Sequence, residues 1–328
     1  MIERATDDPI GRAATLLSEG LLVAFPTETV YGLGADAGNA DALRRLYAAK
    51  GRPGEHPVIV HMARASMMPR WARIVPPIAQ TLADAFWPGP LTLVVPRAEH
   101  VSTLITGGQD SVGLRVPAHP VAHALLERFA VLGGEGIAAP SANRFGRVSA
   151  TLAQHVADEF GSEVSLILDG GACDHGIEST IVDCTRGHPV LLRPGAIAAA
   201  RIARVIGAVP DAAGPDAPRA SGTLESHYAP RTPSYLMARD ELRARVAGLD
   251  TASSAHIAVL AHSLSPIPSF AGHWRVAAQD AVAYAHDLYA NLRALDASGA
   301  LELWIERAAA APEWDAIADR LRRATHRT

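Results

Sequence analysis

Short apolar runs alternate with amphipathic stretches along the first two thirds of the chain. The stretches with apolar residues at helical spacing are 12–17, 39–50, 78–86, 121–129 and 150–160. The runs suited to buried strands are 21–25, 57–62, 91–96, 111–117, 136–140, 179–184 and 189–195. This mixed order predicts an α/β layered fold. The last two strands follow each other without an intervening helix, which predicts a sheet that is not purely parallel.

A change in composition divides the chain further along. Residues 207–233 carry many prolines and few large apolar residues, which is typical of a linker. Beyond them, strand-like runs at 256–262 and 300–306 alternate with amphipathic helices at 280–296 and 313–324. We therefore predict a first domain over 1–206, a linker over 207–233 and a small α/β domain over 234–328.

Composition and net charge argue against several classes of protein. The formal net charge is −4, so the chain lacks the overall basic field of a nucleic-acid-binding protein. The only cysteines, Cys173 and Cys184, lack CxxC spacing and fit a reducing compartment. The N-terminus is acidic without an apolar core, and we find no apolar run of about 18 residues. These features predict a cytoplasmic protein without a membrane partner.

One lysine stands out among the cationic residues. Of the 30 lysines and arginines, only Lys50 is a lysine, and it ends the predicted helix 39–50 within AAKGRP. A compact ammonium and a planar guanidinium are not equivalent, so its retention favours a specific role. Chance survival stays open as the alternative.

Several familiar motifs are absent or imperfect. Gly32, Gly34 and Gly38 form GxGxxxG, which is one residue off the dinucleotide fingerprint and does not open a helix. No GxxxxGK[ST] motif, GxSxG elbow or zinc-ligand spacing occurs. Any phosphate site must therefore use another design.

Cations beside small residues supply such a design. Lys50 and Arg52 flank a helix end, and Arg115 lies in a strand that begins at Ser111. The segment 140–143 (PSAN) and Ser149 offer hydroxyl and backbone N–H groups, and Arg193 ends a strand. Any one arginine could be a solvated strand end, but together they suit a polyphosphate. A lone strand histidine such as His61 is commonly a packing residue.

Seven motifs, taken in their order along the chain, resemble those of one protein family. They are PTETVYGLG (26–34), KGRP (50–53), PGPLTLVV (88–95), LRVPAHP (114–120), APSAN (139–143), GIESTIVD (176–183) and LLRPG (191–195). Over about residues 10–206 the chain resembles the YrdC/TsaC threonylcarbamoyl-AMP synthases, and HYAP (227–230) resembles their long form. The resemblance implies a YrdC-like twisted mixed sheet with helices on both sides, followed by a small Rossmann-like α/β domain.

The resemblance also implies a reaction. The family makes threonylcarbamoyl-AMP and pyrophosphate from L-threonine, bicarbonate or CO2, and ATP. Mg2+ would be carried by ATP rather than by protein ligands. A downstream threonylcarbamoyl transferase would move the group to adenosine 37 of tRNAs reading ANN codons, so tRNA would meet this chain only indirectly or weakly.

Site residues follow from the matched motifs. By resemblance, Lys50 and Arg52 are catalytic, and Thr29 lies in the same motifs. The threonine pocket would be lined by Tyr31, His61, Arg115, Ala139 and Ser179. ATP would contact Lys50, Arg52, His56, Ser111, Ser141, Asn143, Ser149, Arg193 and Tyr228. The chain departs from the family at His56, where Asn is common, and at SGTLES (221–226), which lacks the usual Pro and Met.

Two other functions fit parts of the sequence. A carbamoyl-adenylate domain of the hydrogenase-maturation type shares the fold, but its zinc-finger and acylphosphatase parts are not found here. A non-catalytic RNA-binding module of the same fold is the alternative from another class, although RNP-like aromatics are missing. Threonine- and bicarbonate-dependent ATP consumption distinguishes an enzyme from such a module.

Overall fold

The computed structural model describes residues 1–326 as two compact units. Unit 1 comprises Met1–Phe145 and Ser149–Thr223, and unit 2 comprises Gly146–Val148 and Leu224–Thr328. The segment predicted as a linker, 207–233, is divided between them. Its first part, including the short strand β11 (Asp211–Ala212), belongs to unit 1.

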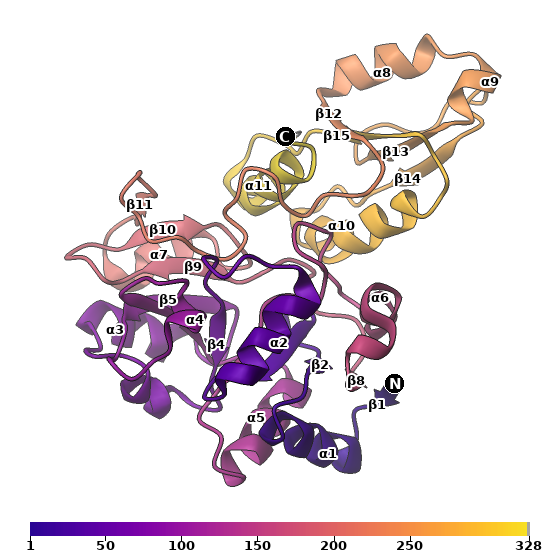
Figure 1. The fold of residues 1–328 in the computed structure, drawn as a ribbon. Helices are drawn as coiled ribbons and strands as arrows, with labels where there is room; N and C mark the ends of the chain where they lie inside the picture. The colour runs from indigo at the N-terminus through magenta and orange to yellow at the C-terminus, as the bar shows by residue number, and fades with distance from the viewer. Residues whose placement is uncertain (327–328) are drawn as a thin grey trace. The chain divides into compact units, whose positions relative to one another are not determined.

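An 11-stranded mixed sheet forms the centre of unit 1 (Figure 1). Its strand order is β1-β8-β2-β3-β7-β4-β6-β5-β9-β10-β11. The two strands that follow each other directly, β9 and β10, pair antiparallel, so the prediction of a mixed sheet is confirmed. The bounds are β1 (Ile2–Arg4), β2 (Val23–Phe25), β3 (Gly32–Asp36), β4 (Ile59–His61), β5 (Leu91–Pro96), β6 (Ser111–Arg115), β7 (Ile137–Ala138), β8 (Leu166–Asp169), β9 (Thr180–Asp183) and β10 (Val190–Arg193).

Helices cover both faces of this sheet, because successive side chains of each strand point to opposite faces. In β2, Ala24 joins the core cluster that includes α2, α3, α6 and α7, whereas Val23 and Phe25 join the cluster with α1 and α5. Figure 1 shows α1 and α5 side by side on their face. The helices are α1 (Asp7–Ser18), α2 (Ala40–Lys50), α3 (Pro77–Phe86), α4 (Thr103–Thr106), α5 (Pro120–Val131), α6 (Ala153–Phe160) and α7 (Ala199–Ile206).

Helix α2 begins and ends where its sequence signals predict. The Asn39 side chain accepts hydrogen bonds from the backbone N–H groups of Asp41 and Ala42, which caps the first turn. Gly51 adopts a left-handed conformation with φ of 60° just past the last turn. Lys50 is the last residue of the helix, so this ending fixes the direction in which its side chain points.

The glycine-rich segment that misses the dinucleotide fingerprint forms β3. A Cβ atom on Gly34 would lie 2.9 Å from Ile137 Cγ2 and 2.9 Å from Phe25 Cε1. Gly34 therefore permits close packing of three strands, and it lies within a strand rather than at a helix N-terminus.

We expect Gly34→Ala to lower the free energy of unfolding by about 1–3 kcal/mol, the usual cost of overpacking. Gly11→Ala is the matched control, because Gly11 lies in α1 and its added Cβ meets nothing within 4 Å. Urea denaturation measures both variants. An unchanged midpoint for Gly34→Ala would contradict the packing account.

Unit 2 is a small Rossmann-like α/β domain. Its sheet is all-parallel, with the strand order β12-β15-β13-β14. The predicted strands and helices correspond to β13, β15, α10 and α11. Elements that the sequence did not reveal are β12, β14, α8 and α9, which are short or mostly polar. The bounds are β12 (Ser234–Met237), α8 (Arg239–Ala247), α9 (Thr251–Ser254), β13 (Ile257–Ala261), β14 (His273–Val276), α10 (Ala281–Asp296), β15 (Glu302–Glu306) and α11 (Asp315–Ala324).

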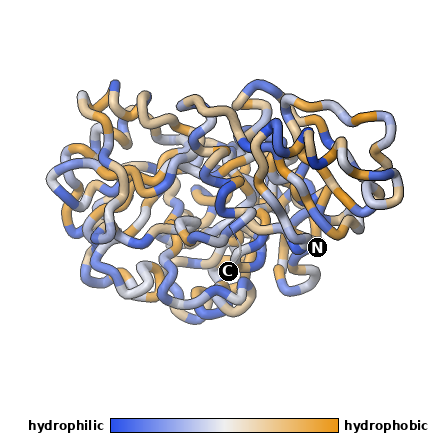
Figure 2. Tube along the Cα trace, turned by 90° about the horizontal axis from the view of Figure 1, so that it is seen from above, coloured by the Kyte–Doolittle hydropathy of each residue, from blue (hydrophilic) through white to orange (hydrophobic). Residues whose placement is uncertain are grey.

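Apolar and polar stretches alternate along the whole trace in Figure 2. Within residues 1–326, none of the helices has both the length and the apolar character needed to cross a bilayer.

Candidate active site

Four adjacent strands of unit 1, β4, β6, β5 and β9, present several residues of the candidate site on one face. On β6, Val112 and Leu114 point into the core, so Ser111, Gly113 and Arg115 point to the other face. His61 on β4 pairs in register with Arg115. Instead of a helix, the segment around Ala217 and Ala220 packs here, against Val94, Ile181, Val190 and Leu192.

Arg115 is the centre of a buried charged cluster. Its Nη2 donates to Glu28 Oε1 at 2.6 Å, its Nη1 to Thr29 Oγ1 at 2.9 Å and its Nε to the Gly89 carbonyl at 3.3 Å. Both side chains of the ion pair are only 4% exposed. Arg115 is therefore no solvated strand end, and two of its five N–H groups are left for a ligand.

The cluster also sets the protonation of its members. Burial alone would raise the pKa of Glu28, but the charge and hydrogen bond of Arg115 outweigh it and hold that pKa below its usual value. Burial, reinforced by the charge of Arg115, lowers the pKa of His61 to about 3. Glu28 is therefore ionised and His61 neutral near pH 7. Among the described residues, Glu28 Oε2 and His61 Nδ1 are buried without a hydrogen-bond partner.

Lys50 is buried between two backbone carbonyls. Its Nζ donates to the Ser141 carbonyl at 2.6 Å and to the Asn143 carbonyl. Burial, and then the neighbouring charge of Arg52, lowers the pKa of Lys50 well below its usual value. The loop 139–143 continues from β7, the sheet neighbour of β4, so Lys50 ties the PSAN segment to the end of α2.

A chain of hydrogen bonds joins the remaining cations. Arg193 Nη2 donates to the Ser179 carbonyl at 2.8 Å, and Arg193 Nη1 donates to the Ser221 carbonyl at 2.7 Å. Arg52 Nη2 reaches Ser221 Oγ at 3.2 Å, and Ser179 Oγ lies 2.8 Å from Thr92 Oγ1. The network brings two predicted phosphate-binding cations to one short segment of chain.

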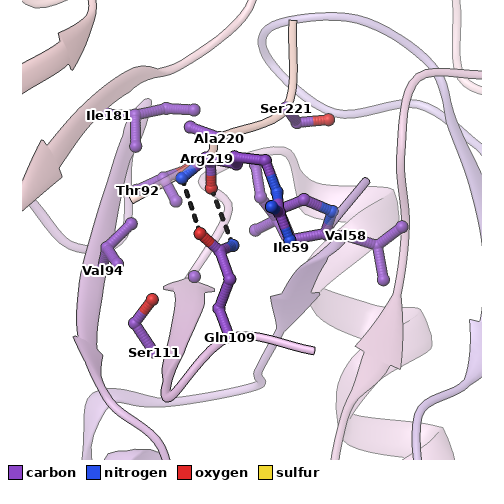
Figure 3. A pocket seen from close by; sticks show the side chains of 12 residues that line it. Val58, Ile59, Thr92, Val94, Gln109, Ser111, Ile181, Arg219, Ala220 and Ser221 are labelled. Atoms are coloured by element: carbon purple, nitrogen blue, oxygen red, sulfur yellow. Dashed lines mark hydrogen bonds between the residues drawn. The ribbon is translucent and has the colours of Figure 1, made fainter. Parts of the chain in front are cut away.

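A pocket lies beside this network, between the strand face and the segment 219–221 (Figure 3). Ile59, Val94 and Ile181 supply its apolar wall, and Ser111 its polar end. The Gln109 side chain holds the covering segment: its Oε1 accepts from the Arg219 backbone N–H at 2.6 Å, and its Nε2 donates to the Arg219 carbonyl at 3.1 Å. Both bonds appear as dashed lines in Figure 3.

The other predicted residues have distinct surroundings. Ser149 Oγ donates to Glu178 Oε1 at 2.6 Å, and the His56 ring lies 5.1 Å from the Phe145 ring. Ala139 is buried, with its backbone N–H bonded to the Ile59 carbonyl.

Tyr31 and Tyr228 also lie outside the Arg115 cluster and the Arg52–Arg193 network. The Tyr31 ring is in the core cluster of the opposite face, and its hydroxyl donates to the Gly171 carbonyl at 2.8 Å. Tyr228 belongs to unit 2, where its buried ring stacks on Tyr289 with centroids 5.6 Å apart. Their contacts with substrates stay predictions.

The structure adds partners that sequence reasoning did not select. Glu28 lies within the quoted TET motif and could have been found there as a charge between two threonines. Thr92 lies within the quoted PGPLTLVV motif, whereas Gln109 and Arg219 have no signal of their own. Ser221 begins the SGTLES segment, which was noted only for what it lacks.

Comparison with known proteins gives matches to both units. A family model for Sua5, YciO and YrdC proteins, described as telomere recombination, matches residues 15–195. A second, described as the C-terminal domain of threonylcarbamoyl-AMP synthase, matches residues 197–325.

Several individual proteins are similar over most of the chain. A Pyrococcus abyssi threonylcarbamoyl-AMP synthase is 45% identical over 74% of this chain and 73% of its own length. One from Bacillus subtilis is 45% identical over 70% of this chain and 67% of its own. The structure of P. abyssi Sua5 with L-threonine aligns with a TM-score of 0.89 at 37% identity, covering 99% of this chain and 96% of that one.

Proposed function

The chain belongs to the Sua5/YrdC family of threonylcarbamoyl-AMP synthases, and we propose that its reaction takes place in unit 1, on the face of β4, β6, β5 and β9 described above. The enzyme transfers AMP to threonylcarbamate. The observation that supports this location is the burial of four cations in one unit, all at 8% exposure or less: Lys50, Arg52, Arg115 and Arg193. Buried cations suit anionic ligands, and the reaction supplies a triphosphate and a carboxylate.

The chemistry requires positioning more than a protein nucleophile. The amine of threonine adds to CO2 and gives a carbamate, with loss of a proton. A carbamate oxygen then attacks the α-phosphorus of ATP, and pyrophosphate leaves. Such transfers depend on alignment and on positive charge around the phosphates.

The Arg115 cluster suits the amino acid. The two remaining N–H groups of Arg115 would hold the threonine carboxylate in a bidentate manner. Neutral His61, whose Nδ1 has no partner among the described residues, would contact the threonine hydroxyl. An amino acid without that hydroxyl would leave a buried polar atom unpaired, which accounts for discrimination. A related protein, P. abyssi Sua5, has been solved with L-threonine bound.

The cation network suits the nucleotide. Arg52 and Arg193 would exchange Ser221 for phosphate oxygens, and Lys50 would neutralise charge that grows on the α-phosphate. Mg2+ would arrive bound to ATP, coordinated largely by the phosphates and water, and would neutralise further negative charge. Among residues 1–326, His, Cys, Asp and Glu form no group of three or more arranged for a metal ion.

Pyrophosphate release in the presence and absence of each substrate tests the function. We expect ATP consumption to require both L-threonine and bicarbonate and to proceed without tRNA. Mass spectrometry of the product should give the mass of threonylcarbamoyl-AMP. An RNA-binding module of the same fold would release no pyrophosphate, and that result would refute the proposal.

The product is a mixed anhydride, which hydrolyses readily in water. A downstream threonylcarbamoyl transferase acting on adenosine 37 of ANN-reading tRNAs would have to consume it. This chain would then meet tRNA only indirectly, in keeping with its net charge of −4.

We expect Gln109→Ala to lower the KM for ATP by up to about tenfold. The variant loses two hydrogen bonds, each worth about 0.5–1.5 kcal/mol, that hold 219–221 against the pocket. Phosphates could then displace Ser221 from Arg52 and Arg193 more easily. Steady-state kinetics with varied ATP measure the change, and Gln80→Ala, on the exposed face of α3, is the control. An increased KM would show that the segment assists binding instead.

A further inference from the structure

Glu28 leaves a buried carboxylate oxygen without a partner inside the cluster assigned to threonine. Oε1 accepts from Arg115, and the backbone N–H groups of Glu28 and Ala118 also help to lower the pKa of this carboxyl, but Oε2 has no partner at hydrogen-bond geometry within residues 1–326. Glu28 is 3% exposed, so water does not compensate freely. A buried polar atom without a donor costs roughly 1–3 kcal/mol, and more when it is charged. Its presence in a substrate site indicates a donor that arrives with the substrate.

The charge of threonine matches this need. The free amino acid is a zwitterion, so its carboxylate requires a cation and its α-ammonium requires an anion close by. The Arg115–Glu28 pair presents both signs side by side in a buried location with no net charge. Binding a zwitterion against such a pair leaves the total charge of the site unchanged, which limits the desolvation penalty.

We propose that Glu28 binds the α-ammonium group of L-threonine through Oε2, while Oε1 continues to hold Arg115. This inference rests on the proposed function, because it takes the Arg115 cluster as the threonine site. Arg115 keeps Glu28 ionised near pH 7, as the acceptor of an ammonium must be. The histidines that face Glu28, His61, His119 and His175, all have lowered pKa values caused first by burial, so they add little competing charge.

A different role for Glu28 would be to position Arg115 and nothing more. A ligand that lacks the amine distinguishes these two roles of Glu28. 3-Hydroxybutyrate keeps the carboxylate and hydroxyl of threonine but has hydrogen in place of the ammonium. A residue that acts through Arg115 affects both ligands equally, whereas an ammonium ligand affects threonine alone.

Isothermal titration of wild type and Glu28→Gln with both ligands tests the proposal. The glutamine keeps the shape of the side chain and an oxygen that can accept from Arg115. We expect threonine affinity to fall by roughly 10- to 100-fold, the equivalent of one charge-assisted hydrogen bond, and 3-hydroxybutyrate affinity to change little. Glu306→Gln removes another buried carboxylate, in unit 2, and should change neither affinity.

Each other outcome has a defined meaning. Equal losses for both ligands, or no loss for threonine, would overturn the ammonium contact and leave the proposed function standing. A wild-type protein that binds neither ligand would contradict the proposed function itself. If Glu28→Gln does not fold, a crystal structure of wild type with L-threonine decides. The threonine nitrogen should lie within about 3.2 Å of Oε2, and a separation beyond about 4 Å would overturn the proposal.

Discussion

Lys50→Ala lowers the rate of threonine-dependent pyrophosphate release by roughly 10²–10³-fold, the usual cost of removing one preorganised donor. The structure gives two reasons for an effect of this size. The ammonium group is the cation at the end of α2, beside Arg52, and it also holds the Ser141 and Asn143 carbonyls. In the proposed site, its loss would remove positive charge near the phosphates, and it would also release the PSAN loop. A coupled pyrophosphate assay under saturating substrates measures the change.

Two further variants separate these contributions. Arg44→Ala removes an exposed cation of the same helix and should leave the rate unchanged. Lys50→Arg keeps a charge, but a planar fork is a poor fit between two carbonyls that a compact ammonium now bridges, so we expect at least a tenfold loss. Full activity of Lys50→Arg would show that charge alone matters. Near-normal pyrophosphate release by Lys50→Ala would refute the catalytic role.

Most of unit 1 could be predicted from periodicity because its strands are buried and its helices amphipathic. The two strands at 179–195 correctly indicated a mixed sheet, since their connection is too short for a parallel crossover. Elements that bury little apolar surface gave no such signal, and the buried strand β8 was missed as well. Strand β14 is largely exposed, and β3 was hidden in a glycine-rich motif whose glycines serve close strand packing.

The site was predictable at the level of motifs but not of contacts. Sequence reasoning selected Arg115, Lys50 and Arg193 as a set, and the structure places all three buried in unit 1. It did not select Glu28, because the pair with Arg115 joins residues 87 positions apart. The covering of the strand face by 217–221 was missed for a related reason. That segment is alanine-rich and polar, so its packing depends on Gln109 rather than on an apolar pattern of its own.

Arg115→Met lowers the free energy of unfolding by about 3–5 kcal/mol, because it leaves the Glu28 carboxylate buried without its partner. The deficit should depend on pH. In wild type the pKa of Glu28 is lowered, so the stability from the pair is present above the ordinary glutamate pKa and lost as pH falls through the folded value. Without Arg115, burial raises that pKa, and acid neutralises Glu28 earlier. The difference between wild type and variant in urea denaturation should therefore shrink as pH is lowered.

Glu28→Gln combined with Arg115→Met gives the sharpest version of this prediction. The double variant removes both charges from the cluster, so most of the lost stability should return, since a neutral pair in place of a buried ion pair is often tolerated. Threonine binding should stay undetectable, because neither the carboxylate nor the ammonium of the substrate would meet its opposite charge. A double variant as unstable as Arg115→Met would mean that the arginine supports the strand face by packing and by its bonds to Thr29 and Gly89. Recovered stability without threonine binding would instead show that the fold does not depend on the buried pair, whereas substrate binding does.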